Sequence, residues 1–314
     1  MAKQSRFFFL IERLLRSLRS LAMTTMFLEM SATHYFSERI CEVTYAMNMK
    51  LLLLVIISTV VCAQQSTVMI IAHHGASSSA PENTLAAFRK AIEQGADAVV
   101  VDVRQTKDEH LVALHDATID RTTNGEGYIS DYKLKQIQKL DAGSWFNDAF
   151  SNEHIPTFDE VCAVLSPSTK IIIEIRDGSS VYPNIEQHVL DAIKKNNIEQ
   201  RACIKSFDIA ILKKCRQLYS KIPLIYSYTF HIPLLNIIVD KGVSLGSVFD
   251  IDAEYLQPYK LLLTASFVSK AQKRNYRIIA WGVETKESVR EALELGVDAI
   301  ETESPLMVKK MIAK

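Results

Sequence analysis

Residues 68–103 read VMIIAHHGASSSAPENTLAAFRKAIEQGADAVVVDV, and this stretch decides the fold. Two short runs rich in β-branched residues, 68–72 and 98–103, flank a helical pattern over 84–94. Nearly continuous apolar runs are typical of strands that are buried on both faces of a parallel sheet. The stretch therefore predicts one strand–helix–strand unit, with polar residues where each strand ends.

The same alternation continues along the rest of the chain. Strand-like runs recur at 171–175, 202–205, 224–228, 243–248, 278–283 and 299–302, and helical patterns at 158–165, 185–196, 209–218, 232–241, 266–274 and 286–295. Eight strands in about 245 residues predict an α/β protein of the TIM (β/α)8 barrel class. A doubly wound open sheet is the alternative, although the sequence contains neither a GxGxxG motif nor a P-loop.

One apolar run departs from this rhythm. Residues 111–115 follow Asp102 after a link that is too short for a parallel crossover, which needs about a dozen residues. We therefore expect a β-hairpin after the second strand, turning at residues 108–109, with Asp102 opposite His115. Opposed residues of an antiparallel pair point the same way, so this register places His115 beside Asp102.

Residues 117–156 show no strand–helix pattern. They contain RTTNGEG at 121–127 and LDAGSWF at 140–146. Barrel active sites lie at the C-terminal ends of the strands. We therefore expect this irregular insertion to lie over the C-terminal face, as a lid or a substrate wall.

The N-terminal residues do not fit the barrel pattern. Lys50 precedes an apolar run over 51–61 and a small-residue cleavage motif that ends at Ala63, which predicts a signal peptide over 49–63. The apolar run is shorter than the roughly 20 residues that span a bilayer, so no stable transmembrane segment is expected. The predicted organisation is an N-terminal extension over 1–48 outside the fold, the signal peptide, and a barrel domain over 64–314.

Two interpretations of residues 1–46 remain open. Translation from Met47 or Met49 would give a secreted or lumenal protein. If the extension is translated, its Arg-rich helical segment over 6–19 resembles a transit peptide, and the protein would be organellar or membrane-anchored.

Composition excludes some classes of partner and site. The chain has 36 Lys+Arg and 36 Asp+Glu residues, and no basic run follows residue 64, so no nucleic-acid partner is expected. Cys162, Cys203 and Cys215 do not have the spacing of a zinc site. A Cys203–Cys215 disulfide remains open in an oxidising compartment.

Polar residues at the predicted strand ends offer acid–base and metal chemistry. His73 and His115 end the first strand and the hairpin, and two histidines suit a general base and a general acid at neutral pH. Asp102 and Glu174 offer oxygen ligands of the kind that Mg²⁺ and Ca²⁺ prefer. Arg176 shares the face of Glu174 and suits a phosphate oxygen. Each of these residues, taken alone, is more simply explained as a helix or loop cap or as a packing residue. Their convergence on one face of the predicted barrel favours an active site.

An ordered set of motifs runs from residue 69 to 312. It strongly resembles the glycerophosphodiester phosphodiesterase family in IAHHG 71–75, PENT 81–84, GAD 95–97, DV 102–103, TKD 106–108, HD 115–116, RTT 121–123, LDAGSWF 140–146, PT 156–157, EIR 174–176, SF 206–207, Trp281 and GVD 296–298. The resemblance implies a metal-dependent TIM barrel that hydrolyses glycerophosphodiesters to glycerol 3-phosphate and an alcohol in lipid metabolism. The implied partner is a small glycerophosphodiester or a lysophospholipid head group, and the implied cofactor is Mg²⁺ or Ca²⁺. Attack by water and attack by the glycerol hydroxyl of the substrate both remain open.

The resemblance also implies roles for single residues. It gives catalytic roles to His73 and His115, and metal-binding roles to Asp102 and Glu174. Substrate-binding positions fall on His74, Arg176 and Trp281. Glu82 and Asn83 are expected to support these groups, Glu82 by orienting a histidine.

Three positions depart from the family pattern. His74 stands where the family has Arg, Val100 where it has Glu, and Arg176 where it has Lys. His74 is expected to be mostly neutral at pH 7 and so to weaken a phosphate contact. Val100 removes one of two acids that would bind the ion together, and Glu301 on the eighth strand is a candidate replacement. An alternative is therefore a barrel that binds phosphodiesters or lipids without efficient turnover.

Overall fold

The computed structural model describes residues 12–19, 49, 68–229 and 247–313. The chain divides into two units, Met1–Gln65 and Ser66–Lys314. In the first unit, residues 12–19 are helical, and Arg16 bonds to Glu12 one turn away. Among the described residues, no helix is both long and apolar enough to cross a membrane. The predicted signal peptide and the domain boundaries stay predictions.

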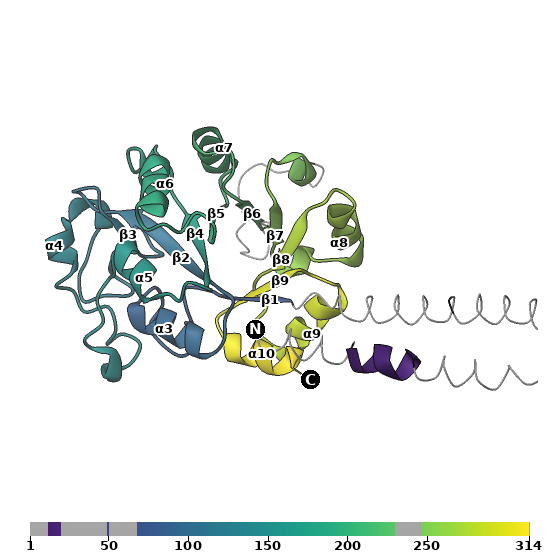
Figure 1. Ribbon diagram of the computed structural model, residues 1–314. Helices are drawn as coiled ribbons and strands as arrows, with labels where there is room; N and C mark the ends of the chain where they lie inside the picture. Colours follow the sequence, from purple (N-terminus) through teal and green to yellow (C-terminus); the bar gives the residue numbers. More distant parts are fainter. Residues whose placement is uncertain (1–11, 20–48, 50–67, 230–246, 314) are drawn as a thin grey trace, which may run out of the picture. The chain divides into compact units, whose positions relative to one another are not determined.

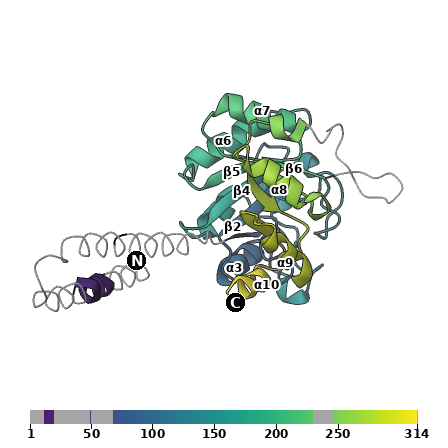
Figure 2. The same cartoon turned by 90° about the vertical axis from the view of Figure 1, so that its right-hand side faces the viewer.

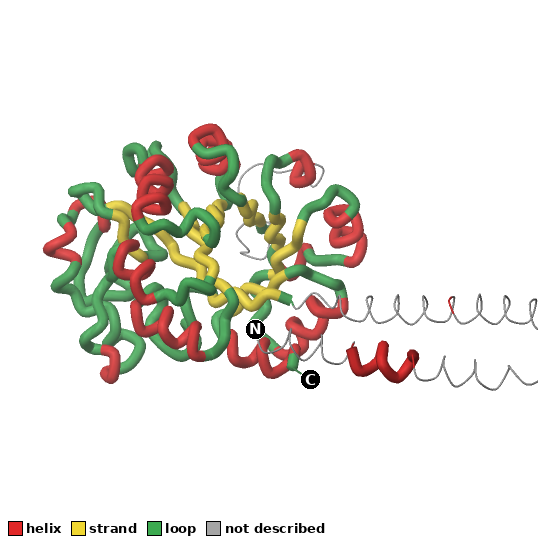
Figure 3. The backbone as a smooth tube through the Cα atoms, viewed as in Figure 1, coloured by secondary structure: helices red, strands yellow, loops and turns green. Residues whose placement is uncertain are grey.

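The second unit is a closed barrel of parallel strands surrounded by helices (Figures 1 and 3). The barrel strands are β1 (Met69–Ala72), β2 (Ala98–Gln105), β4 (Lys170–Ile175), β5 (Ala202–Ser206), β6 (Leu224–Tyr228), β7 (Tyr255–Pro258), β8 (Arg277–Ala280) and β9 (Ala299–Thr302). They follow the order β1-β9-β8-β7-β6-β5-β4-β2, and pairing of β1 with β2 closes the ring. The predicted TIM barrel is confirmed.

Most of the helices around the barrel begin at a side-chain cap. The helices packed around the barrel are α3 (Leu85–Glu93), α5 (Phe158–Val164), α6 (Ile185–Lys195), α7 (Ile209–Leu218), α8 (Ala265–Gln272), α9 (Lys286–Glu294) and α10 (Pro305–Ile312). The exceptions to side-chain capping are α6 and α10. Thr84 and Thr157 accept hydrogen bonds from the first turns of α3 and α5, which satisfies amides that have no partner within the helix. Figure 2 shows the helices around the barrel from a second direction.

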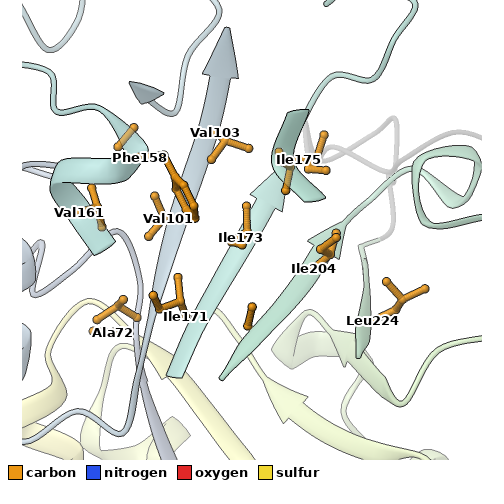
Figure 4. Packing of buried hydrophobic residues seen from close by; sticks show 14 of the residues in the cluster. Ala72, Val101, Val103, Phe158, Val161, Ile171, Ile173, Ile175, Ile204 and Leu224 are labelled. Carbon is orange, nitrogen blue, oxygen red and sulfur yellow. The ribbon is translucent and has the colours of Figure 1, made fainter. Parts of the chain in front are cut away.

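The strands bury apolar side chains on both faces, as the continuous apolar runs predict. Val101 and Val103 of β2 point outward, toward Phe158 and Val161 of α5 (Figure 4). Val100 points into the barrel, where it packs with the inner residues Ile71, Ile172, Ile225 and Ile279. Because alternate residues of a strand face opposite sides, Asp102 shares the inward face of Val100. The strand therefore places one carboxylate directly above an apolar floor.

The structure places the seventh barrel strand later in the chain than the prediction did. Residues 243–246 and the helix predicted over 232–241 lie outside the described residues, and Val248 belongs to the 3₁₀ turn η4 (Ser247–Asp250). The barrel strand is β7, which pairs with β6 and β8. Its sequence YLQP carries an inward-facing glutamine and a proline at its end, so it lacks the apolar pattern that marks the other strands.

The hairpin is confirmed, but its register differs from the prediction by one residue. In β3 (Leu111–Ala113), Ala113 pairs with Val103, and the amide of Leu114 donates to the carbonyl of Asp102 at 3.0 Å. The turn has three residues instead of two, because Glu109 adopts a left-handed conformation with φ 64°. Asp102 therefore lies opposite residue 114 and not opposite His115.

The insertion over 117–156 packs beside the hairpin. It contains η1 (Ile129–Asp131), the single-turn helix α4 (Leu134–Ile137) and η2 (Asp148–Phe150). Figure 1 shows α4 on the left. The amide of Lys107 donates to the carbonyl of Tyr132 at 2.8 Å, which ties the insertion to the hairpin turn. Its role as a lid stays a prediction.

The cysteines of the barrel unit are free thiols. Cys203 and Cys215 are not bonded to each other, so the disulfide that the sequence left open is not formed. Burial raises the pKa of the Cys162 and Cys215 thiols to about 12, because it disfavours the thiolate. These thiols are therefore protonated at neutral pH and act as small buried side chains.

Candidate active site

A layer of buried polar side chains lies inside the barrel, above the apolar floor and toward the C-terminal ends of the strands. Each member is at most 2% exposed, and the members are Asp102, Glu174, Lys205, Ser227, Gln257 and Glu301. Buried polar groups are stable only when they are paired, so the contacts of this layer define its chemistry. We call it the polar layer.

The segment after β1 carries two histidines to the barrel mouth. His74 and Gly75 have positive φ values of 57° and 82°, which turns the chain sharply after His73. A Cβ atom on Gly75 would lie 2.6 Å from the carbonyl carbon of Ala87, so only glycine fits against α3. The turn brings the rings of His73 and His74 to 3.6 Å between centroids. The ring of His115 lies 5.1 Å from that of His74, so His74 is next to both of the predicted catalytic histidines.

His74 forms an ion pair with Asp102. Its Nε2 atom lies 2.9 Å from Oδ2 of Asp102, and that oxygen also accepts a bond of 2.8 Å from the amide of Asn83. Burial alone would lower the pKa of His74, but the Asp102 carboxylate outweighs it and raises that pKa. His74 in turn holds the pKa of Asp102 well below its usual range, against the effect of burial. The Asp102 carboxylate thus favours the charged form of His74, an effect that the sequence-based expectation of a mostly neutral side chain did not include.

His73 has the opposite electrostatic environment. Its Nε2 atom lies 3.5 Å from Oε1 of Glu301, and its side chain is 22% exposed at the mouth. Burial lowers its pKa well below 6.5, and the positive charges of His74 and Lys205 lower it further. His73 is therefore neutral at physiological pH and available as a proton acceptor.

A chain of charged groups orients His115. Its Nδ1 atom lies 2.6 Å from Oδ1 of Asp116, whose other oxygen accepts 2.6 Å from Nε of Arg121. Glu82 grips the same guanidinium with both oxygens, at 2.7 and 2.8 Å. Burial would raise the pKa of Asp116, but the bonds from Arg121 and His115 outweigh it and lower the pKa to about 2. Glu82 is thus linked to His115 through Arg121 and Asp116, and its orienting role stays a prediction.

Lys205 links two carboxylates across the inside of the barrel. Its ammonium lies 2.9 Å from Oε2 of Glu174 and donates to the two oxygens of Glu301 at 2.7 and 3.0 Å. Burial would lower the pKa of Lys205, but Glu174 and Glu301 outweigh it and raise that pKa. Glu301 also accepts 2.6 Å from the amide of Gln257, so each of its oxygens has a donor.

Arg176 lies at the entrance to the polar layer. Its guanidinium donates to Oε1 of Glu174 at 2.9 Å and lies 3.9 Å from Oδ1 of Asp102. Burial would lower its pKa, but these carboxylates raise it. Its side chain is 29% exposed, which leaves donors free to contact a bound anion.

Trp281 follows β8 and belongs to an aromatic group at the mouth. Its ring meets Phe207 edge-on at 5.7 Å and Tyr259 at 4.9 Å between centroids. Its indole Nε1 is buried and has no hydrogen-bond partner among the described residues. That donor suits a substrate oxygen, so its substrate-binding role stays a prediction.

The side chains do not fit a divalent ion as they are arranged. Mg²⁺ and Ca²⁺ take six or more oxygen ligands. In the polar layer only Oδ1 of Asp102 is buried without a hydrogen-bond donor, whereas both oxygens of Glu174 and Glu301 are bound to cationic or amide groups. The described residues contain no group of three or more acids, histidines or cysteines arranged to hold an ion. Glu301 therefore does not replace the acid missing at Val100.

The structure brings most of the predicted site residues into contact and adds others, whereas Trp281 contacts Phe207 and Tyr259 instead. Asp116, Arg121, Lys205 and Gln257 were not predicted as site residues, although each contacts one that was. Lys205 could have been identified from the sequence, because a lysine on the inward face of a barrel strand requires a buried partner. No sequence pattern indicated the contact between Arg121 and Glu82, since 39 residues separate them and Arg121 lies in an irregular region.

A TIM barrel with histidines and buried charged groups at its mouth has the arrangement of a barrel enzyme. Comparison with known proteins identifies the family. The model of the glycerophosphoryl diester phosphodiesterase family matches residues 73–307. A glycerophosphodiester phosphodiesterase of Caldanaerobacter subterraneus is 36% identical over 237 residues, which cover 74% of this chain and 93% of the relative. A glycerophosphodiester phosphodiesterase of Bacillus altitudinis is 30% identical, over 72% of this chain and 90% of the relative.

Solved structures have the same fold. A phosphodiesterase of Oleispira antarctica, in complex with the product sn-glycerol 3-phosphate, superposes with a TM-score of 0.71 at 24% identity. The match covers 78% of this chain and 97% of that one. The chain belongs to the glycerophosphoryl diester phosphodiesterase family, and it is an enzyme of the phosphoric diester hydrolase class.

Proposed function

We propose that this enzyme hydrolyses glycerophosphodiesters to glycerol 3-phosphate and an alcohol. The observation that carries the proposal is the presence of a neutral His73 and an Asp116-bound His115 at one barrel mouth, on either side of His74, together with the partly exposed cation Arg176. An acid–base pair next to a fixed positive charge is what cleavage of an anionic phosphodiester requires. The glycerol 3-phosphate bound to the Oleispira antarctica phosphodiesterase supports the same class of product.

In this mechanism each proton has a defined acceptor or donor. His73 accepts a proton from the attacking oxygen, and the nearby Glu301 carboxylate stabilises the imidazolium that forms. His115, held by Asp116, is placed to give a proton to the oxygen of the leaving alcohol. Arg176 donates to the phosphoryl oxygens, where negative charge increases during the reaction. The predicted use of Mg²⁺ or Ca²⁺ enters no step, because the carboxylates that would bind the ion are already paired.

Hydrolysis of glycerophosphocholine by the full chain tests the proposal. We expect choline to be released, and ³¹P spectra to show glycerol 3-phosphate. A cyclic phosphate product would instead identify the glycerol hydroxyl as the attacking group. If substrate binds but no choline is released with EDTA, Mg²⁺ or Ca²⁺, the barrel is a binding protein with lost turnover.

The pH dependence of activity follows from His73. A general base acts in its neutral form, which predominates above its pKa, and burial, His74 and Lys205 hold this pKa well below 6.5. We therefore expect kcat/KM to persist as pH falls to 6.5 and to decline only at lower pH. His74→Gln removes one of the charges that lower this pKa, so it should move the acid limb to higher pH. An unchanged acid limb in His74→Gln would show that another group controls it.

Arg121 is a positioning residue whose loss should reduce turnover. In Arg121→Met, Asp116 loses the donor that fixes it, and His115 loses its fixed orientation. Small misplacements of a catalytic group are costly, so we expect kcat to fall by about tenfold to a hundredfold. Arg121→Lys keeps the charge but not the bidentate contact with Glu82, and should be intermediate. If the Arg121→Met variant keeps the kcat of the wild type, Arg121 does not have this positioning role.

We also propose that the mature protein is secreted or lumenal, on the basis of the signal-like segment over 49–63. N-terminal sequencing of protein from the native source should find Gln64 at the start. A start within residues 1–46 would favour the organellar or membrane-anchored alternative.

A further inference from the structure

Lys205 occupies an unusual position for a lysine. Its side chain is 2% exposed and extends inward from β5 to Glu301 on β9, although β6, β7 and β8 separate these strands in the ring (Figure 1). On the other side the same ammonium meets Glu174 on the adjacent strand β4. A fully buried lysine is rare unless it is paired, and this one is paired twice.

The ammonium has no capacity left for a substrate. An ammonium has three donors, and its contacts at 2.7, 2.9 and 3.0 Å all lead to Glu174 and Glu301. Lys205 is therefore a positioning residue that sets the charge beneath the mouth and fixes two carboxylates. The cation that faces the substrate is Arg176, which lies above the same Glu174.

Val100 and Lys205 change the charge of the barrel interior in the same direction. Val100 lies two residues before Asp102 on the same inward face and packs among aliphatic side chains. Glutamate at position 100 and a neutral residue at position 205 would make the net charge of the barrel interior two units more negative. A bound divalent ion would supply the same two units of positive charge. With Val100 and Lys205 in place, the barrel interior lacks the two units of excess negative charge that a divalent ion would neutralise.

We propose that Lys205 is the resident cation of this site and takes the place of the divalent ion that the family resemblance implies. Glu174 and Glu301 then serve as its counter-ions and not as metal ligands. Two consequences follow: the site does not bind a divalent ion, and hydrolysis proceeds in the presence of a chelator. The second consequence rests on the proposed function, whereas the first does not.

Direct measurement of ion binding tests the proposal without reference to activity. The full chain is freed of metal with EDTA, desalted and titrated with Mn²⁺ while free Mn²⁺ is followed by electron paramagnetic resonance. We expect no stoichiometric binding by the wild type. One tightly bound Mn²⁺ per chain that is lost in Asp102→Asn would overturn the proposal.

A pair of substitutions should restore an ion site. The double variant Val100→Glu/Lys205→Met supplies the missing acid and removes the ammonium, so we expect it to gain one bound Mn²⁺ per chain. Val100→Glu alone should not bind, because Lys205 still holds Glu174 and Glu301. The matched control Val100→Gln/Lys205→Met has the same shape without the added charge, and should bind much less tightly than the double variant. Equal binding by Val100→Glu alone and by the double variant would contradict the role of Lys205.

Activity gives a second, separate readout. We expect glycerophosphocholine hydrolysis by the wild type to be unchanged by excess EDTA or Mg²⁺. Hydrolysis that is lost in EDTA and regained with Mg²⁺ would overturn the proposal while leaving the proposed function intact. If hydrolysis is absent in both conditions, the proposed function fails, and the wild-type Mn²⁺ titration still decides the role of Lys205. The titration and the chelator assay need no variant, so they stand even if a Lys205 variant fails to fold.

Discussion

Replacement of His73 by Gln should lower kcat for glycerophosphocholine by about 10²- to 10⁴-fold, the usual contribution of a positioned general base. Gln keeps a polar group of similar length but cannot accept the proton of the attacking oxygen. Burial and neighbouring positive charge lower the pKa of His73, which suits this imidazole to act as the base. KM should change less than kcat, because Arg176 and not His73 is placed to contact the phosphoryl oxygens.

The control for this substitution is a histidine on the same barrel but away from the mouth. His110 is exposed at the end of the hairpin turn, so His110→Gln should leave kcat unchanged. Both variants should unfold at temperatures close to that of the wild type, since His73 is partly exposed and its contact with Glu301 is long, at 3.5 Å. A wild-type kcat in His73→Gln would remove His73 from the mechanism and would leave His115 as the acid–base candidate to test.

The sequence predicts the barrel well because the patterns that mark its strands and its hairpin are local in the sequence. Continuous apolar runs mark strands that are buried on two faces, and β7 was missed where an inward glutamine interrupts that pattern. The hairpin was predicted from the length of its link. Its register depends on the left-handed conformation of Glu109. Residues other than glycine seldom adopt this conformation, so the sequence did not indicate it.

The site is less predictable, because its chemistry depends on which charges meet. Positions at strand ends identified His73, Asp102 and Glu174, since parallel strands bring their ends together. The pairing of His74 with Asp102 depends on a sharp turn, and that of Lys205 with Glu301 on reach across the barrel. Such contacts join residues far apart in the sequence, so the same acids could be read as ligands of an ion or as partners of a buried lysine.

Replacement of Lys205 by Met should have the largest effect on stability. Removal of one partner from a buried ion pair costs about 3–5 kcal/mol, because the other charge stays buried without compensation. For a domain of this size that loss lowers Tm by roughly 6–20 °C. The effect should be smaller at low pH, because protonated glutamates carry no charge to compensate. Circular dichroism melts at several pH values measure both quantities.

The two carboxylates bonded to Lys205 should not contribute equally to this loss. Glu174 keeps Arg176 at 2.9 Å after the substitution, whereas the described residues leave Glu301 with the amide of Gln257 and the neutral His73. Glu301→Gln should therefore recover much of the stability lost in Lys205→Met, because the glutamine still accepts from Gln257 and carries no charge. The double variant should be more stable than the sum of the single effects predicts, which identifies direct coupling between the two residues. Strict additivity would mean that the ammonium does not compensate Glu301, and the barrel interior would then need another source of positive charge.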